Sequence, residues 1–220
     1  MRIDFISDIS CPWCAIGASA LECALQRIGD DIPVELHFRP FELNPDMPPA
    51  GEGLESYLER QLGMDREQIA AANAMLHERG AAVGFEFGHR SRVWNTFDAH
   101  RLLSWADAQG PAGSQRKLKL SLLRAYHGQD RNPGAHDLLL DLAGAAGLDV
   151  EQARTLLASD AFATEVRDDQ RRWRQMGIHS VPTMIINGQS AIAGARSADE
   201  YLRIIQVIQQ EQAQLPEHTR

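Results

Sequence analysis

The sequence predicts an α/β fold in which a small sheet is interrupted by a long helical insertion. A strand, a helix and a second strand occupy roughly the first forty residues. The periodicity from about residue 54 to 176 is helical almost without interruption, and the chain then returns to strand patterns. A chain of 220 residues is long enough for one domain with a large insertion or for two closely joined domains.

The first unit begins with a predicted strand at residues 3–6 and continues into a helix that ends near residue 28. Apolar residues suited to a buried helix face recur there at helical spacing: Ile16, Ala20, Ala24 and Ile28. At residues 34–38 the period changes to two, as in a half-buried strand. A right-handed crossover would make the two strands parallel.

Residues 44–177 are predicted to form the inserted domain, which is expected to be all helical. Asp65 with Gln68 and Asp149 with Gln152 are typical of helix N-terminal capping pairs. Glycines stand where helix C-termini would need them, at Gly110, Gly128, Gly147 and Gly177. Residues 1–43 and 178–220 are then the two parts of a discontinuous domain that holds the sheet.

The last segment contains a strong hairpin signal. Strand-like runs at residues 183–186 and 190–193 flank Asn187-Gly188, a dipeptide that favours a two-residue turn. A final helix at about residues 197–212 has apolar residues on one side: Tyr201, Ile204, Ile205 and Ile208. The complete order is β-α-β, a helical block and β-β-α, which is the order of a thioredoxin fold with a large inserted helical domain.

Two cysteines at the start of the first helix, in Cys11-Pro12-Trp13-Cys14, indicate redox chemistry. Residues three apart in a helical turn are neighbours, which suits the roughly 4.4–6.8 Å between Cα atoms that a disulfide requires. With Pro12 at the first helical position, Cys11 lies at or beside the N-cap and faces free backbone amides. That placement favours a thiolate, so Cys11 is predicted to be the nucleophile and Cys14 the resolving thiol.

Zinc binding is the main structural alternative for this cysteine pair. Structural zinc requires four ligands, and the third cysteine, Cys23, stands alone in a helix where a small core side chain is expected. None of the eight histidines forms a second pair with metal-ligand spacing. We therefore expect no metal site.

The charge and the N-terminus limit the partners and the compartment. A formal net charge of −8 without a basic stripe argues against nucleic acid, and no apolar run approaches the length of a membrane span. The chain passes from Met1 directly into the first strand, so a cytoplasmic location is expected if Met1 is the native start. In a reducing compartment, paired cysteines are more often catalytic or redox-sensing than structural.

Four sequence blocks together resemble the DsbA family of thiol-disulfide oxidoreductases, specifically its FrnE-like cytoplasmic branch. The blocks are Cys11-Pro12-Trp13-Cys14, residues 38–45 (FRPFELNP), residues 95–102 (NTFDAHRL) and Val181-Pro182-Thr183, in the order and spacing of the family. The resemblance covers nearly the whole chain. It implies a thioredoxin fold with an inserted helical domain, disulfide exchange, and a cis peptide bond before Pro182 that leaves the backbone of Val181 free to pair with a substrate peptide.

Other candidate site residues are assigned less directly. Pro12 and Trp13 would tune the stability of the Cys11 thiolate. By resemblance, Asn95 and His100 lie close to the active site and could line a substrate groove, although Asn95 could instead cap a helix. Asp8, three residues before Cys11, could accept a proton from Cys14, or it could be a turn residue that bonds its own backbone.

A related pair of enzyme classes supplies the alternative function. The 2-hydroxychromene-2-carboxylate isomerases and kappa-class glutathione transferases resemble this family in fold and hold glutathione at the same corner. They carry serine where this chain has Cys11, and they lack the second cysteine. Disulfide exchange or isomerisation without a metal or organic cofactor is therefore the leading hypothesis, with protein or small-molecule thiols and disulfides as partners. A glutathione-dependent isomerase or transferase, or a redox-sensing binding module, stays open, as do the direction of exchange and the oligomeric state, a homodimer included.

Overall fold

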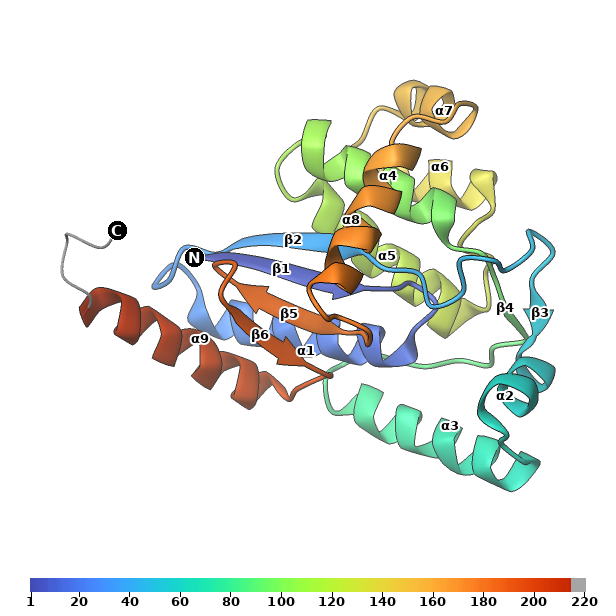
Figure 1. The fold of residues 1–220 in the computed structure, drawn as a ribbon, viewed down its shortest axis with the longest axis horizontal. Helices are drawn as coiled ribbons and strands as arrows, with labels where there is room; N and C mark the ends of the chain where they lie inside the picture. Colours follow the sequence, from blue (N-terminus) through green and yellow to red (C-terminus); the bar gives the residue numbers. More distant parts are fainter. Residues whose placement is uncertain (215–220) are drawn as a thin grey trace.

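A computed structural model describes residues 1–214, so the last six residues of the predicted 178–220 segment lie outside the described part (Figure 1). The main sheet has the order β2-β1-β5-β6. It is built from β1 (Arg2–Ser7), β2 (Glu35–Pro40), β5 (Thr183–Ile186) and β6 (Ser190–Ala193). The strand β1 is parallel to β2 and antiparallel to β5, and β5 and β6 form the predicted hairpin. The expected α/β class and order of elements are confirmed.

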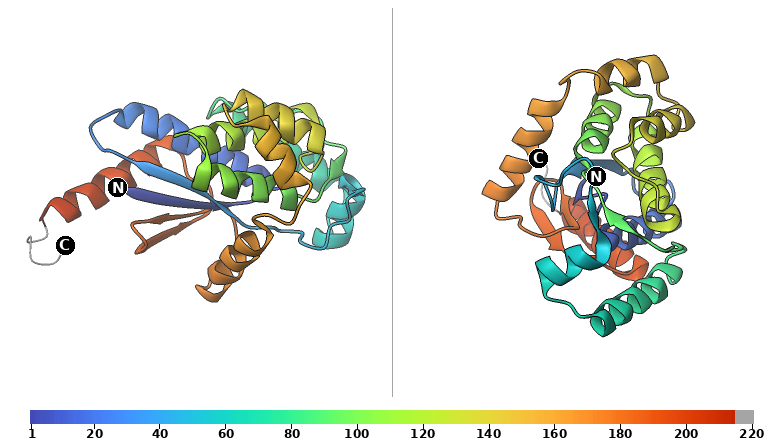
Figure 2. Two further views of the ribbon diagram at one scale, coloured as in Figure 1. Left: turned by 90° about the horizontal axis from the view of Figure 1, so that it is seen from above. Right: turned by 90° about the vertical axis from the view of Figure 1, so that its right-hand side faces the viewer.

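Two layers of helix cover the sheet (Figure 2). On one face, α1 (Pro12–Ile28) and α9 (Ala198–Gln214) pack against the side chains of Ile3 and Phe5. On the other face, α8 (Ala163–Gln175) packs through Trp173 against Ile6 and Ile185. Successive residues of β1 thus bury their side chains in opposite layers, as the period of two in a strand requires. The C-terminal end of β1 leads into the cysteine pair between these layers.

The insertion is mainly helical. Its helices are α2 (Leu54–Leu62), α3 (Arg66–Ala81), α4 (Phe97–Gln109), α5 (Ser114–Gln129), α6 (His136–Ala145), α7 (Val150–Leu157) and α8. Asp65 and Gln68 form a reciprocal capping box, and Asp149 accepts hydrogen bonds at the start of α7, so both predicted capping pairs are confirmed. Gly110, Gly147 and Gly177 follow helix ends. The prediction for Gly128 is wrong, because α5 continues past it and ends beside Asp130, which adopts the left-handed conformation.

The expectation of an all-helical insertion is also wrong in one place. Two short strands, β3 (Glu52–Gly53) and β4 (Arg92–Val93), pair in antiparallel fashion. Strands of two residues are too short to show an alternating pattern, and their pairing is a long-range contact that local sequence does not encode. The guanidinium of Arg92 donates hydrogen bonds to the carbonyl of Ala50 beside this ribbon.

The insertion and the sheet share part of their cores. One buried cluster lies almost wholly within α4, α5, α6 and α7, but it also contains Ile9, two residues before Cys11. A second cluster joins the sheet and α1 to Leu76, Phe85, Phe87 and Leu123 of the insertion. The chain segment that carries the cysteines is therefore held from both sides, by the sheet and by the insertion.

Candidate active site

Cys11 lies at the N-cap of α1, with extended backbone angles (φ −84°, ψ 115°), and Pro12 occupies the first helical position. The backbone N–H of Cys14 donates to the carbonyl of Cys11 at 3.1 Å, closing the first turn. Both cysteines are free thiols, and the exposed fractions are 4% for Cys11 and 0% for Cys14. The two sulfurs thus differ little in exposure. Their ease of ionisation must therefore differ mainly through their hydrogen bonds.

The pKa values of the two thiols move in opposite directions. A hydrogen bond from the Cys14 thiol lowers the pKa of Cys11, and the backbone amides of Cys14 and Trp13 add to this, although burial and the charge of Asp8 oppose it. Burial raises the pKa of Cys14 well above its ordinary value, and the neighbouring Cys11 raises it further. Since the thiolate is the attacking species, Cys11 is the more nucleophilic of the pair.

The strand end that precedes β5 lies directly beside Cys11. The Cys11 thiol donates to the carbonyl of Val181, with Sγ and O 3.7 Å apart, and the peptide bond between Val181 and Pro182 is cis. Pro182 is buried below the half-buried Val181. Gly17 allows this close approach, because a Cβ atom there would stand 3.1 Å from Cγ of Pro182 and 3.2 Å from Cζ of Phe5.

The remaining motif residues complete this corner. Pro12 and Trp13 are half-buried, and Trp13 packs against the core cluster below the sheet. Thr183 is buried as the first residue of β5, and its hydroxyl donates to the carbonyl of Ser180 at 2.9 Å. The structure therefore places the two predicted motif segments, residues 11–14 and 181–183, side by side.

Asp8 is the centre of a buried hydrogen-bond cluster. Its carboxylate accepts from the backbone and hydroxyl of Ser10 (3.1 and 2.7 Å), the N–H of Leu43 (2.8 Å), the hydroxyl of Thr96 (2.9 Å) and Nε2 of His100 (3.4 Å). These donors come from the cysteine loop, the segment after β2, and the start of α4. Asp8 thus ties three parts of the chain together below Cys11.

This cluster favours a structural role for Asp8 over the hypothesis that Asp8 accepts a proton from Cys14. Burial alone would raise the pKa of Asp8, but the hydrogen bond and charge of His100 and the other donors outweigh it and hold the pKa well below its ordinary range. Burial lowers the pKa of His100, so its ring is a neutral donor near pH 7. A carboxylate with this many donors is a weak base, and the alternative reading of Asp8 as a structural residue fits better.

The two other predicted substrate residues do not contact Cys11. His100 is 1% exposed, and its Nε2 lies 3.4 Å from the carboxylate of Asp8, so its ring is enclosed on the buried face of α4. Asn95 accepts a hydrogen bond from the N–H of Phe97 and donates to the carbonyl of Met47. It also lines a cavity of about 970 Å³ between the segment after β2 and α8.

Sequence reasoning missed several residues around the cysteines. Nε2–H of His127 donates to the carbonyl of Ile9 (2.8 Å). Burial lowers the pKa of His127 to about 3, so the ring is neutral near pH 7. Burial raises the pKa of Glu42 to about 7 where it meets Gln170 of α8. Lys119 of α5 is fully buried near the cysteines.

Neither a metal site nor a membrane span is evident in the described part of the chain. Within residues 1–214, no three His, Cys, Asp or Glu side chains are grouped as ligands of a metal ion. Among the same residues, the helices are too short or too polar to cross a bilayer.

Comparison with known proteins identifies the family. A family model described as a DSBA-like thioredoxin domain matches residues 2–206, from β1 into α9. The chain belongs to this family. The resemblance inferred from the four sequence blocks is therefore confirmed, and the thioredoxin fold of this DsbA-like protein is established over most of its length.

Solved structures agree with this assignment. A probable DsbA oxidoreductase from Streptomyces coelicolor is 32% identical, with a TM-score of 0.86 over 98% of this chain and 92% of that chain. Two further similarities are at 14% identity and show the fold alone. They are 2-hydroxychromene-2-carboxylate isomerase (TM-score 0.68, 97% of each chain) and the cytosolic disulfide reductase DsbM from Pseudomonas aeruginosa with GSH (TM-score 0.67, 96% of this chain and 100% of that chain).

Proposed function

We propose that this DsbA-like protein is a thiol-disulfide oxidoreductase in which Cys11 attacks and Cys14 resolves. The observation that carries the proposal is the opposite displacement of the two thiol pKa values at one helix N-terminus. The Cys11 thiol is the more easily ionised of the two. It also lies beside the carbonyl of Val181, which belongs to the segment just before β5. The Streptomyces coelicolor relative, described as a probable DsbA oxidoreductase, supports the same activity.

The reaction consists of two thiol exchanges. The Cys11 thiolate attacks one sulfur of a substrate disulfide, forming a mixed disulfide and releasing the other sulfur as a thiolate. Cys14 then loses its proton and attacks Sγ of Cys11, which forms the Cys11–Cys14 disulfide and releases the second substrate thiolate. The substrate disulfide is reduced by two electrons, and the dithiol is oxidised by two. Oxidation of a substrate dithiol follows the same steps in reverse, and neither direction requires a metal or an organic cofactor.

Thiol counting and trapping test this function. The purified protein is expected to change by two thiols between reducing and oxidising buffers, and to catalyse reduction of insulin disulfides with dithiothreitol as the electron donor. Cys11→Ser should abolish catalysis. Cys14→Ser should accumulate mixed disulfides visible by gel electrophoresis, whereas Cys23→Ser, the matched change at the third cysteine, should do neither. Thiol counts that stay constant would overturn the proposal.

A glutathione-dependent isomerase or transferase is the second candidate, because the isomerase shares the fold. It would need one group to hold glutathione and would have no use for a resolving thiol one helical turn away. Tight glutathione binding and isomerisation of an aromatic substrate, with unchanged thiol counts, would favour it. Glutathione is also a reasonable co-substrate for the exchange reaction, since DsbM was solved with GSH.

The substrates we propose are protein or small-molecule thiols and disulfides, and the compartment we propose is the cytoplasm. DsbM, which shares the fold, is described as cytosolic. Fractionation of cells expressing the full chain with a C-terminal tag would test the compartment, and recovery in a periplasmic or secreted fraction would contradict it.

A further inference from the structure

Lys119 is a buried cation without a partner. The side chain is 0% exposed, and its Nζ has no hydrogen-bond partner among the described residues. The centroid of the Phe38 ring lies 5.9 Å from Nζ. A buried ammonium ordinarily requires a counter-charge or several acceptors, because leaving water is costly. Such a group calls for an explanation in terms of what lies around it.

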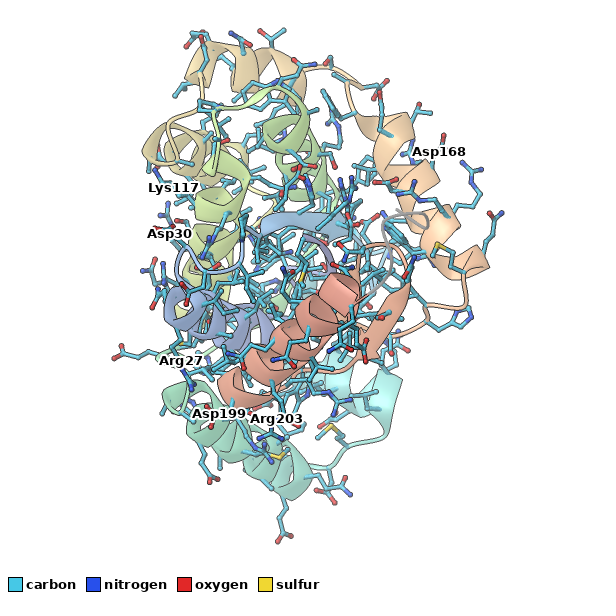
Figure 3. The ribbon with its side chains drawn as sticks, turned by 90° about the vertical axis from the view of Figure 1, so that its left-hand side faces the viewer. Arg27, Asp30, Lys117, Asp168, Asp199 and Arg203 are labelled. Carbon is cyan, nitrogen blue, oxygen red and sulfur yellow. The ribbon has the colours of Figure 1, made fainter. Side chains whose placement is uncertain are left out.

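The sequence makes this lysine more unusual. Of 22 basic residues besides histidine, the chain has only two lysines, Lys117 and Lys119, and the remainder are arginines. Lys117 is exposed on the outer side of α5 (Figure 3). An arginine cannot release its proton in a protein, whereas a desolvated lysine can. Lys119 is thus the one buried cation without a hydrogen-bond partner among the described residues, and it is of the residue type that can lose its charge.

The surroundings of Lys119 connect it to the cysteine pair. Burial lowers the pKa of Lys119 to about 8. The negative charges of three neighbours oppose this and favour the ammonium, with the strongest effect from Cys14, followed by Asp8 and Cys11. The effect is mutual, since Lys119 lowers the pKa of Cys14. His100 and His127 also sense the Lys119 charge, but both rings are already held neutral by burial. The helix α5, which carries Lys119, packs against α1, which carries Cys14, and against β2, which carries Phe38.

We propose that Lys119, as the neutral amine, accepts the proton of Cys14 in the resolving step and returns it in the reverse reaction. This inference rests on the proposed function and names the base that its second exchange needs. The Asp8 carboxylate is saturated by hydrogen bonds from three parts of the chain, whereas the Lys119 amine has a free lone pair when deprotonated.

The step balances as follows in the direction of substrate reduction. In the mixed disulfide, the Cys14 thiol passes its proton to Nζ of Lys119, directly or through one water, and becomes a thiolate. The thiolate attacks Sγ of Cys11, the bond between Cys11 and the substrate sulfur breaks, and the substrate leaves with the electron pair and takes a proton from solvent. Lys119 later releases its proton to solvent. In reverse, the ammonium of Lys119 protonates Cys14 as it leaves the Cys11–Cys14 disulfide.

A two-phase reaction with 5,5′-dithiobis(2-nitrobenzoate) separates the two exchanges. In a Cys23→Ser background, attack by Cys11 releases one thionitrobenzoate, and resolution by Cys14 releases a second. Lys119→Met should change the rate of the first phase by no more than about threefold, because Cys11 interacts with Lys119 more weakly than Cys14 does. It should slow the second phase by about 100-fold near neutral pH, with the deficit shrinking at high pH as Cys14 ionises without help. Lys117→Met, the matched change on the exposed side of α5, should leave both phases as in the parent.

The outcomes separate the two hypotheses. If the parent protein releases no second equivalent, the proposed function fails, and the role of Lys119 fails with it. If the parent resolves but Lys119→Met does so at the same rate within about threefold, the resolving reaction stands and the role of Lys119 is overturned. A general structural loss in Lys119→Met would slow both phases together, and that result would also contradict the inference.

A measurement on the unmutated protein provides a second test. With two lysines in the chain, ¹³C-labelled lysine gives two resolved side-chain signals, which can be assigned with Lys117→Met. Lys119 should titrate near pH 8, well below the ordinary value of a lysine, about 10.4. Formation of the Cys11–Cys14 disulfide should lower the pKa of Lys119 further, because neither sulfur can then carry the negative charge that favours the Lys119 ammonium. An ordinary pKa for Lys119, or one that does not respond to oxidation, would overturn the inference.

Discussion

Two buried ionisable groups, Asp8 and Lys119, interact with the cysteine pair, and they differ in their hydrogen bonding. The Asp8 region surrounds a carboxylate with donors from the cysteine loop, the segment after β2 and α4. The Lys119 region surrounds an amine with the apolar ring of Phe38 and no hydrogen-bond partner among the described residues. Both groups are buried to the same degree, so burial alone does not distinguish them.

The difference teaches how a buried ionisable group is used in this fold. A charge that is fully hydrogen-bonded is fixed, and it can hold chain segments together. A charge without partners is poorly stabilised, so its proton moves easily near neutral pH. We therefore expect substitutions in the two regions to change stability in opposite directions.

The largest effect is expected for Asp8→Ala. It leaves the buried donors of Leu43, Thr96 and Ser10 without an acceptor, and should lower the free energy of unfolding by about 3–5 kcal/mol. Urea denaturation followed by circular dichroism measures it. Asp30→Ala, at an exposed aspartate near the end of α1, is the control and should change stability by less than about 0.5 kcal/mol. A small loss for Asp8→Ala would show that the cluster does not hold the three segments.

The pH dependence of Asp8 has a definite sign. Its folded pKa lies below the unfolded value of about 3.9, so its contribution is present above that pH and is lost as pH falls toward the folded pKa. Asp8→Asn should therefore destabilise the protein fully near pH 7, and the effect should shrink steadily as pH falls below about 4, with a large part of it remaining at pH 3. A difference that stays constant over this interval would contradict the ionised state assigned to Asp8.

Lys119→Met should have the opposite sign. The folded pKa of Lys119, about 8, is below the unfolded value, so burying its ammonium costs stability below pH 8, and that cost falls as pH rises toward the unfolded pKa. The variant should be more stable than the parent by about 2–3 kcal/mol near pH 7, with a smaller gain above about pH 10. Urea denaturation at both pH values measures this, and Lys117→Met should show no gain. A destabilised Lys119→Met would mean that the ammonium has stabilising partners.

A smaller effect is expected for Thr96→Val, which removes one hydroxyl donor from Asp8 and keeps the shape of the side chain. The carboxylate retains its other donors, so the free energy of unfolding should fall by about 1 kcal/mol. Thr155→Val is the matched control, because that hydroxyl donates to the carbonyl of Glu151 on an exposed helix face. Equal losses in the two variants would argue against a special contribution of the Asp8 cluster.

The smallest effect concerns the pKa of Cys11. The charge of Asp8 raises that pKa, so Asp8→Asn should lower it. Thiolate absorbance against pH, recorded in a Cys14→Ser and Cys23→Ser background, measures it, with Asp30→Asn as the control. An upward shift would show that Asp8 acts on Cys11 mainly through the position of the loop rather than through its charge.

The fold was largely predictable because its signals are local. The Cys11-Pro12 pair at a helix N-terminus, the Asn187-Gly188 turn and the Asp65 capping box each act between residues close in sequence, and each is confirmed. The ribbon of β3 and β4 was not predicted, because it joins segments about forty residues apart through two residue pairs. Short-range patterns carry no information about such pairings.

The site divides in the same way. Sequence alone determined which thiol stands at the N-cap of α1, because helix geometry and Pro12 decide that locally. Only the tertiary structure decided that His100 bonds Asp8, and that Asp8 is saturated by donors from distant segments. Lys117 and Lys119 show the limit most clearly, because they are two residues apart on one helix and yet one is exposed and the other is fully buried. The packing of α5 against α1 and β2 determines which of the two lysines is buried, because the free energy of burial depends on what lies opposite each helix face.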